Sequence, residues 1–304
     1  MLREPAQPYT IGHRYPTQDE VDEGFTRWTS DVSNAAHHLL TIGTALIFII
    51  PLVWMFSASL RQPGLAPPSR LEWIPQPVVL SNYATVYNDL LPFGAYLANS
   101  LKVVALAVPL TIIASSWAGF AMAQINPRPR NILIVISLAT LLVPVTALWI
   151  TRFLVYKWLG VLDTLWAVIL PSFMGTSPFY VLLFHWAFTR IPVELYESAR
   201  LEGASAFRVW ATIGMPLVRP SIVAVAVLSF VFYWSNFIDP LLYLNSQTNY
   251  TLPLGLQALK QMVPTQFPLL MTGAVMITIP VIIMFVFAQR YFLDDTRGAG
   301  WLGR

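Results

Sequence analysis

The most polar stretch with helix character in this chain is residues 191–205, which carries Glu194, Glu197, Arg200 and Glu202. Carboxylate and guanidinium groups form charge-assisted hydrogen bonds, so these side chains are suited to binding another protein. Apolar segments long enough to cross a bilayer flank the stretch on both sides. It must therefore lie at the water interface, where a soluble partner can bind it.

The pattern of this stretch predicts a helix, a turn and a second helix. Glu194 and Glu197 lie near the start of the first helix, where acidic residues suit the helix dipole. Gly203 supplies the dihedral angles of a tight turn, Ser205 caps the second helix, and Pro216 ends it. A helix that merely lies on lipid would instead show Lys and Arg on one face and large apolar residues on the other. We call residues 192–216 the knob and predict that it is rigid and docks into a cleft on another protein.

The composition is that of a membrane protein. Of the 304 residues, 56% are hydrophobic and 11% are charged, whereas about a quarter of the residues of soluble domains are charged. The net charge of +3 is too small to indicate nucleic-acid binding, and the lack of cysteine excludes disulfides and thiolate metal sites. The sequence has no phosphate-binding loop of the form Gly-x4-Gly-Lys-Ser/Thr, so it cannot hydrolyse a nucleotide by the usual route. We expect no catalytic residue, cofactor or metal on this chain.

Six apolar segments are long enough to cross a hydrocarbon core of about 30 Å at about 1.5 Å per residue. Their approximate bounds are 38–60, 96–123, 131–150, 162–188, 220–244 and 269–292. Pro144 is predicted to break or bend the third segment, and Pro171, Gly175 and Pro178 interrupt the fourth. The predicted fold is an all-α polytopic membrane protein with six transmembrane helices.

The spans divide the chain into a six-helix domain over residues 39–293 and two tails, 1–38 and 294–304. The first tail is polar and lacks the apolar core of a signal peptide, and a short amphipathic helix is expected near residues 19–34. Residues 245–267 are expected to form a polar loop.

The distribution of Lys and Arg predicts the orientation. One set of tails and loops, which includes the knob, carries 12 of these residues, and the opposite set carries 5. Since basic loops stay in the cytoplasm, both termini and the knob are expected there, with loops 61–96 and 245–267 outside.

The run 196–205, followed by Ile213 and residues 215–217, resembles the cytoplasmic coupling motif of importer-type ATP-binding-cassette (ABC) permeases. That motif is Glu-Ala-Ala, three residues, Gly, nine residues, then Ile-x-Leu-Pro. Glu197, Ala199 and Gly203 match it directly, whereas Ser198, Glu202 and Met215 replace the first alanine, the frequent aspartate and the leucine. The position of this stretch in the chain, the spacing of its residues and its predicted place between two spans all agree with the motif.

Residues 40–304 are similar to carbohydrate-uptake permeases related to the smaller membrane subunit of the maltose transporter. Further marks of that subfamily are Ser57-Ala58-Ser59-Leu60-Arg61, Ser81-Asn82-Tyr83, Asn99-Ser100-Leu101, Trp234-Ser235-Asn236-Phe237, Pro240-Leu241 and Gln289-Arg290-Tyr291-Phe292.

The resemblance implies a type I ABC importer transmembrane domain in a bacterial or archaeal plasma membrane. An extracytoplasmic binding protein would deliver a sugar, a second permease subunit would complete the channel, and two cytoplasmic ATPase subunits, which hold ATP and Mg, would drive alternating access. Coupling to the ATPases would fall to Glu194, Glu197, Ala199, Arg200, Glu202, Gly203, Ala204 and Pro216. Loop 245–267 would probe the cleft of the binding protein, or else be a simple linker.

Candidate residues of the substrate pathway are Tyr233, Trp234, Asn236, Asp239 and His185. Aromatic rings with amide or carboxylate groups are common in sugar sites. The competing interpretation places the aromatic residues in an interfacial belt and His185 in a hydrogen bond between helices.

Two other classes of protein were weighed. A secondary transporter or channel working alone should show an ion-coupling carboxylate or an inverted repeat, and a membrane enzyme should show paired acids or a metal cluster; we find none of these in the sequence. The identity of the sugar does not follow from the sequence.

Overall fold

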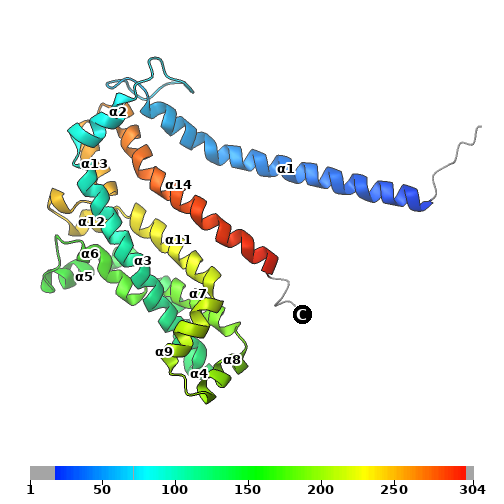
Figure 1. The fold of residues 1–304 in the computed structure, drawn as a ribbon. Helices are drawn as coiled ribbons and strands as arrows, with labels where there is room; N and C mark the ends of the chain where they lie inside the picture. Colours follow the sequence, from blue (N-terminus) through cyan, green and yellow to red (C-terminus); the bar gives the residue numbers. More distant parts are fainter. Residues whose placement is uncertain (1–17, 71, 299–304) are drawn as a thin grey trace, which may run out of the picture. The chain divides into compact units, whose positions relative to one another are not determined.

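The computed structural model describes residues 18–70 and 72–298, and every regular element assigned there is a helix (Figure 1). Predictions for residues 1–17 and 299–304 lie outside the described part. The chain divides into two units, one ending at Trp54 and the other beginning at Met55. Each unit is described by itself.

The first unit contains most of α1 (Gln18–Ser59), a single helix of 42 residues. The sequence predicted a separate short helix near residues 19–34 before the first span. The structure instead shows one continuous helix, because no proline lies between residues 17 and 50 to interrupt it. Its membrane-length portion is His37–Ser59, close to the predicted bounds.

The second unit contains the remaining helices. They are α2 (Ser81–Ala84), η1 (Thr85–Leu90), α3 (Phe93–Gln124), α4 (Pro127–Leu141), α5 (Val145–Trp158), α6 (Trp166–Ile169), η2 (Leu170–Met174), α7 (Pro178–Thr189), α8 (Val193–Leu201), α9 (Ala206–Val209), η3 (Trp210–Gly214), α10 (Met215–Leu217), α11 (Arg219–Ser235), α12 (Ile238–Tyr243), η4 (Gln247–Asn249), α13 (Leu252–Met262) and α14 (Phe267–Gly298). Four helical stretches in the described residues are long and apolar enough to span a membrane. The number rises to six if each of two sharply bent helix pairs is counted as one span. The six predicted spans agree with that upper number, although its second bent pair joins residues 206–217 of the knob to the 17-residue α11, whereas the prediction was 220–244.

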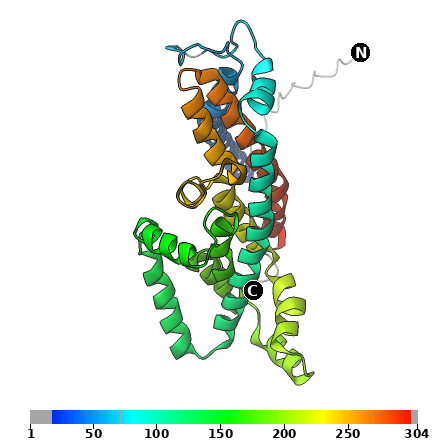
Figure 2. The ribbon, with the colours of Figure 1, turned by 90° about the vertical axis from the view of Figure 1, so that its left-hand side faces the viewer.

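The third predicted span is bent. α4 and α5 meet at an angle of 94°, with Pro144 as the residue before α5 (Figure 2). Proline has no amide hydrogen and so interrupts the helical hydrogen-bond ladder, as the sequence predicted.

The fourth span is broken where the sequence placed its helix breakers. Gly175 (φ 73°) and Thr176 (φ 61°) both adopt left-handed backbone angles between η2 and α7. The Thr176 hydroxyl lies 2.6 Å from that of Thr111 and 2.7 Å from that of Tyr233. These two hydrogen bonds hold a conformation that threonine rarely adopts.

Two regions differ from the prediction. The fifth span, expected over 220–244, ends at Ser235, because Asn236 is extended and its side-chain oxygen accepts a hydrogen bond from the Asp239 amide (3.2 Å) at the start of α12. The expected polar loop 245–267 contains an amphipathic helix, α13.

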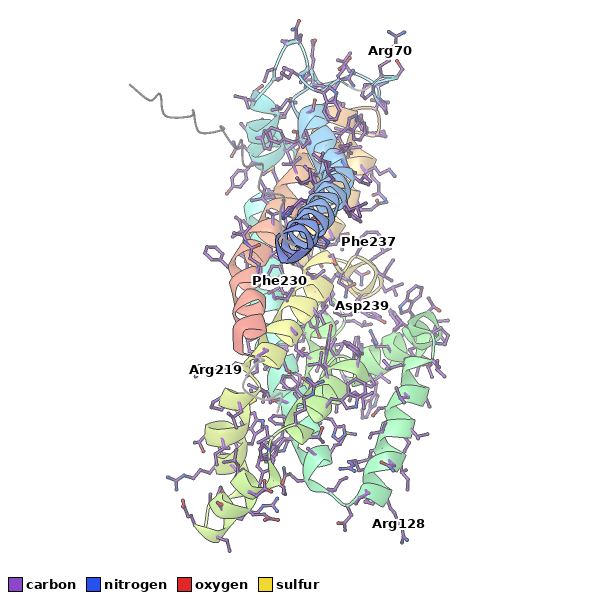
Figure 3. The ribbon with its side chains drawn as sticks, turned by 90° about the vertical axis from the view of Figure 1, so that its right-hand side faces the viewer. Arg70, Arg128, Arg219, Phe230, Phe237 and Asp239 are labelled. Atoms are coloured by element: carbon purple, nitrogen blue, oxygen red, sulfur yellow. The ribbon has the colours of Figure 1, made fainter. Side chains whose placement is uncertain are left out.

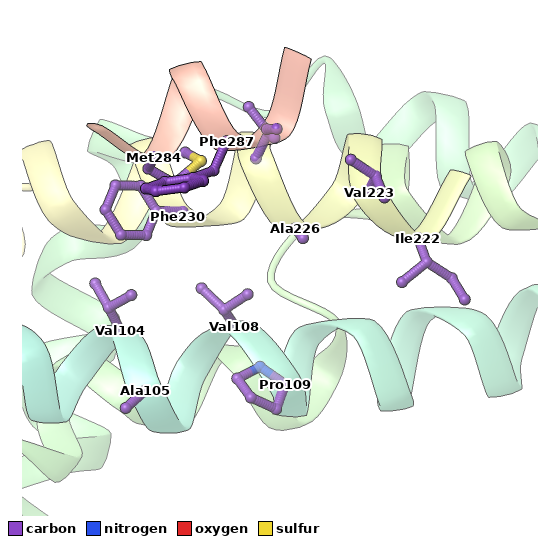
Figure 4. A pocket seen from close by; sticks show the side chains of 12 residues that line it. Val104, Ala105, Val108, Pro109, Ile222, Val223, Ala226, Phe230, Met284 and Phe287 are labelled. Carbon is purple, nitrogen blue, oxygen red and sulfur yellow. The ribbon is translucent and has the colours of Figure 1, made fainter. Parts of the chain in front are cut away.

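Helix α3 lies at the centre of the second unit, packed against α7 and α11, and α11 packs in turn on α14 (Figure 1). α3, α11 and α14 also border an apolar groove of about 480 Å³. Val104 and Val108 face Phe230, Ala226 and Met284 across it (Figure 4).

α3 and α7 approach each other closely at Gly119. A Cβ atom there would lie 2.7 Å from the His185 backbone nitrogen and 2.8 Å from the Val181 carbonyl oxygen. Because these are backbone atoms, the two helices must move apart to admit a side chain.

Gly119→Ala should therefore destabilise the protein by about 1–3 kcal/mol, the usual range for overpacking. Gly43→Ala is the matched control, since a Cβ on Gly43 of α1 meets nothing within 4 Å. Thermal unfolding of the two purified variants in detergent measures the difference. Equal midpoints would show that α3 and α7 are not held in this contact.

Candidate functional site

The knob forms the two short helices that the sequence predicted. α8 ends at Leu201, and Gly203 follows with φ 80°. The Gly203 amide donates to the Arg200 carbonyl (2.9 Å) and the Ala204 amide to the Ala199 carbonyl (3.0 Å), which closes the turn. The Ser205 hydroxyl accepts from the Arg208 amide (3.3 Å) and so caps α9. Both predictions for this turn are confirmed.

The helical segment ends one residue after Pro216, the residue predicted to end it. The π-helical turn η3 and the short helix α10 carry the segment to Leu217, and the chain bends by 84° at Val218 into α11. Pro216 is tolerated because it lies in the first turn of α10, just after the wider π-helical turn, where a missing amide hydrogen costs little.

The first helix of the knob is fixed by Tyr196. Its ring is buried, with its centroid 5.9 Å from that of Phe120 on α3, and its hydroxyl donates to the Phe188 carbonyl (3.2 Å) at the end of α7. Burial raises the pKa of Tyr196 to about 12, so it stays a neutral donor throughout the physiological range. Ala199, one turn along α8, is also buried.

The second helix of the knob also packs on α3. The Trp117 ring of α3 lies 5.2 Å from that of Trp210 and 5.9 Å from that of Phe207. Arg200, which we expected to bind a partner protein, donates instead to the Gln124 side chain at the end of α3 (2.7 Å). Sequence reasoning missed α3 as the support of the knob, although the aromatic residues near the end of the second span were a signal.

The knob exposes acidic side chains beside two large apolar side chains. Within the described residues, the carboxylates of Glu194, Glu197 and Glu202 are exposed and form no side-chain hydrogen bond or ion pair. Leu201 (89% exposed) and Phe207 (62% exposed) lie among them. Acidic groups interspersed with large exposed apolar side chains are typical of a surface that binds another protein.

The structure does not gather the candidate pathway residues into one site. The Trp234 indole nitrogen donates to the Ile277 carbonyl (3.0 Å) and its ring stacks on Phe230, so its polar atom is used in packing α11 on α14. The Tyr233 hydroxyl is bonded to Thr176, and His185 is buried on α7. Their role in substrate binding stays a prediction.

Asp239 is part of a separate polar group. Arg152 of α5 donates to one of its oxygens (3.2 Å) and the Asn236 amide donates to the other (2.9 Å). In Figure 3, Phe237 and Asp239 lie near each other, away from Arg219 at the start of α11. This ion pair fastens α5 to α12, a contact that the sequence did not indicate.

Residues 111–298 match the family of binding-protein-dependent transport system inner membrane components. The chain belongs to this family. The matched range is more than half of the chain and contains the whole knob.

Curated relatives of this permease extend along nearly its whole length. The arabinooligosaccharides transport system permease protein AraQ of Halalkalibacterium halodurans is 32% identical over 270 residues, 87% of this chain and 96% of that protein. The trehalose/maltose transport system permease protein MalG of Thermococcus litoralis is 31% identical over 268 residues, 86% and 95% of the two chains. A crystal structure of a bacterial ABC transporter that imports alginate has a chain of the same fold, with a TM-score of 0.69 at 21% identity over 87% of this chain and 98% of that chain.

The permease also has a tightly bonded loop residue that sequence analysis did not single out. Asp163, between α5 and α6, accepts hydrogen bonds from the amides of Asn245 (2.9 Å) and Ser246 (2.8 Å) and from the Ser246 hydroxyl. The Asn249 side chain donates to its carbonyl oxygen (2.5 Å). Asp163 thus joins the loop before α6 to the loop after α12.

These hydrogen bonds, chiefly those from Ser246, lower the pKa of Asp163 from 3.8 to about 2. The stabilisation they give is complete above about pH 4 and is lost as the pH falls toward 2, because the unfolded chain binds the proton first. We expect the unfolding temperature to fall between pH 5 and pH 2.5, and this fall to be smaller in Asp163→Asn. Asp89→Asn is the control and should keep the wild-type dependence; equal dependence in all three proteins would contradict the role of Asp163.

Proposed function

We propose that this chain is a permease subunit of a carbohydrate importer that is driven by separate ATPase subunits. Its relatives transport arabinooligosaccharides, and trehalose or maltose, by their names, and the related crystal structure is of an alginate importer. The observation that carries the proposal is the knob, a pair of short helices fixed on α3 that exposes Glu194, Glu197, Glu202 and Leu201.

The knob is proposed to seat in a cleft of an ATPase subunit and to transmit its movement to the membrane helices. Glu194, Glu197 and Glu202 make the polar contacts with the ATPase. Gly203 and Ala204 form the turn between the two helices. Ala199 and Arg200 hold the knob on the permease, and Pro216 lies in its last turn. ATP and Mg are bound by the ATPase and not by this chain.

The proposed assembly contains this permease, a second permease of different sequence, two cytoplasmic ATPases and an extracytoplasmic sugar-binding protein. It lies in a bacterial or archaeal plasma membrane. The excess of Lys and Arg on the side of the knob supports a cytoplasmic location of both termini and of the knob. Residues 1–38 and 294–304 are then cytoplasmic tails.

The proposal is tested by purifying the permease with its neighbours and by measuring uptake. An ATPase and a second permease should co-purify, and vesicles containing the complex and its binding protein should import at least one of arabinotriose, maltose and lactose when ATP is supplied inside. Uptake by this chain alone, driven by an ion gradient, would instead establish the alternative of a secondary transporter.

A further inference from the structure

A polar groove of about 300 Å³ lies between α12, η4 and α13. Its polar groups are the side-chain amides of Gln247, Gln257 and Gln261 and the phenol of Tyr250, and Leu254 and Ala258 form part of its apolar lining. Within the described residues, none of the three amides makes a side-chain hydrogen bond. The groove therefore offers several donors and acceptors that its own chain does not use.

The wall that carries Gln247 and Tyr250 is held rigidly. The Asn99 amide of α3 donates to the Thr248 carbonyl (2.8 Å) and the Tyr250 carbonyl (3.1 Å). The Ser100 hydroxyl accepts a hydrogen bond from the Leu252 amide (2.9 Å). Earlier in the same loop, the Asp163 carboxylate accepts one from the Ser246 amide. A backbone that is already fixed does not have to be ordered when a ligand binds, so only the side chains are ordered at that step.

The opposite wall is helix α13. Gln257 and Gln261 are four residues apart and so lie on one face of this helix. Close packing positions the helix against α3, because a Cβ on Gly255 would lie 2.3 Å from the Tyr96 ring. Both walls of the groove are thus fixed to α3.

The chemistry of the groove selects a neutral, hydroxyl-rich ligand. Each amide offers two donor hydrogens and an acceptor oxygen, which suits hydroxyl groups, and the Tyr250 ring and the aliphatic side chains suit the C–H faces of a sugar ring. No charged side chain lines the groove, whereas the neighbouring groove, which shares Gln257 with it, contains Lys260. The volume is at the low end for small-molecule sites of about 300–1,000 Å³, which fits one end of an oligosaccharide.

We propose that this groove is a binding site for a neutral sugar unit on its path into the importer. The inference rests on the proposed function and gives it a specific contact. It also differs from the pathway predicted from sequence, since Tyr233, Trp234 and Asp239 have their polar atoms bonded within the chain.

The test compares the wild type with Gln257→Met/Gln261→Met, which keeps side-chain length and helix propensity but removes the amides. Gln266→Met, just after α13 and outside the groove, is the matched control. The complete complex with its binding protein is placed in vesicles, and the uptake of arabinotriose, maltose and lactose is measured together with ATP hydrolysis stimulated by the loaded binding protein. The double variant should import the transported sugar about 10-fold more slowly, with hydrolysis unchanged.

Three outcomes would overturn the proposal. Uptake by the double variant at the rate of the control would show that the amides do not contact sugar. A parallel loss of uptake and of stimulated ATP hydrolysis would show that the groove is a docking surface for the binding protein. If the wild-type complex imports none of the three sugars, the proposed function fails, and the groove proposal fails with it.

Discussion

Replacing Gly203 by aspartate will abolish uptake while leaving the permease assembled in the membrane. A Cβ on Gly203 meets nothing within 4 Å, so the new side chain clashes with no neighbour, and only the positive φ of 80° strains the backbone. We expect the main effect to come from the added negative side chain at the turn of the knob, where the ATPase is proposed to dock. Uptake in vesicles and the amount of assembled complex are the two measurements.

Gly203→Ala separates backbone strain from the interface. Alanine is strained at a positive φ by about 1–2 kcal/mol, whereas aspartate tolerates this region better. If backbone strain decided the outcome, the alanine variant would be the more impaired of the two. We expect the reverse, with substantial uptake by Gly203→Ala and none by Gly203→Asp. Glu197→Lys, which reverses an exposed charge on α8, should also assemble and fail to transport; normal uptake by Glu197→Lys and Gly203→Asp would remove the coupling role of the knob.

Breaking the ion pair between Arg152 and Asp239 should be the most destabilising change of charge in the second unit. The side chains are 23% and 10% exposed, and their closest atoms lie 3.2 Å apart. Asp239→Leu leaves the Arg152 guanidinium without its partner carboxylate, which costs about 3–5 kcal/mol for a buried pair, with the lower end expected because Arg152 keeps some exposure. The measurement is the thermal unfolding midpoint of the purified complex in detergent.

The control for this prediction is Arg152→Leu/Asp239→Leu, which removes both charges at once. Apolar replacements of a buried ion pair are often neutral, so this double variant should recover more than half of the stability lost by Asp239→Leu. A double variant that is as unstable as the single variant would show that the carboxylate acts through Asn236 and the start of α12 rather than through the ion pair.

Features encoded by a few neighbouring residues were predictable from the sequence. Gly203 and Ser205 carry the chemistry of a turn and a cap, Pro144 lacks the amide hydrogen that a straight helix needs, and the length of an apolar run identifies a span. Each of these signals acts within one or two helical turns, so it does not depend on the rest of the fold.

Features that depend on distant residues were not predictable. Arg152 and Asp239 are 87 positions apart, and Asn99 is 149 positions from Thr248. The contact of Tyr196 with Phe120 likewise requires that α3 and α7 already lie together. Helix α13 was missed because its amphipathic pattern is too short to be a span and its polar face resembles a loop.

The break at Gly175 and Thr176 divides the fourth span into two segments that both pack on α3 but differ in their other attachments. The segment before it follows the loop that Asp163 joins to residues 245–249, and the segment after it leads directly into α8. Because no continuous helical ladder crosses the break, a rotation imposed on α7 through the knob does not have to turn α6. If the knob transmits a movement as proposed, this break lets one end of the span change shape while the other keeps its own, as a carrier that never opens to both compartments at once requires.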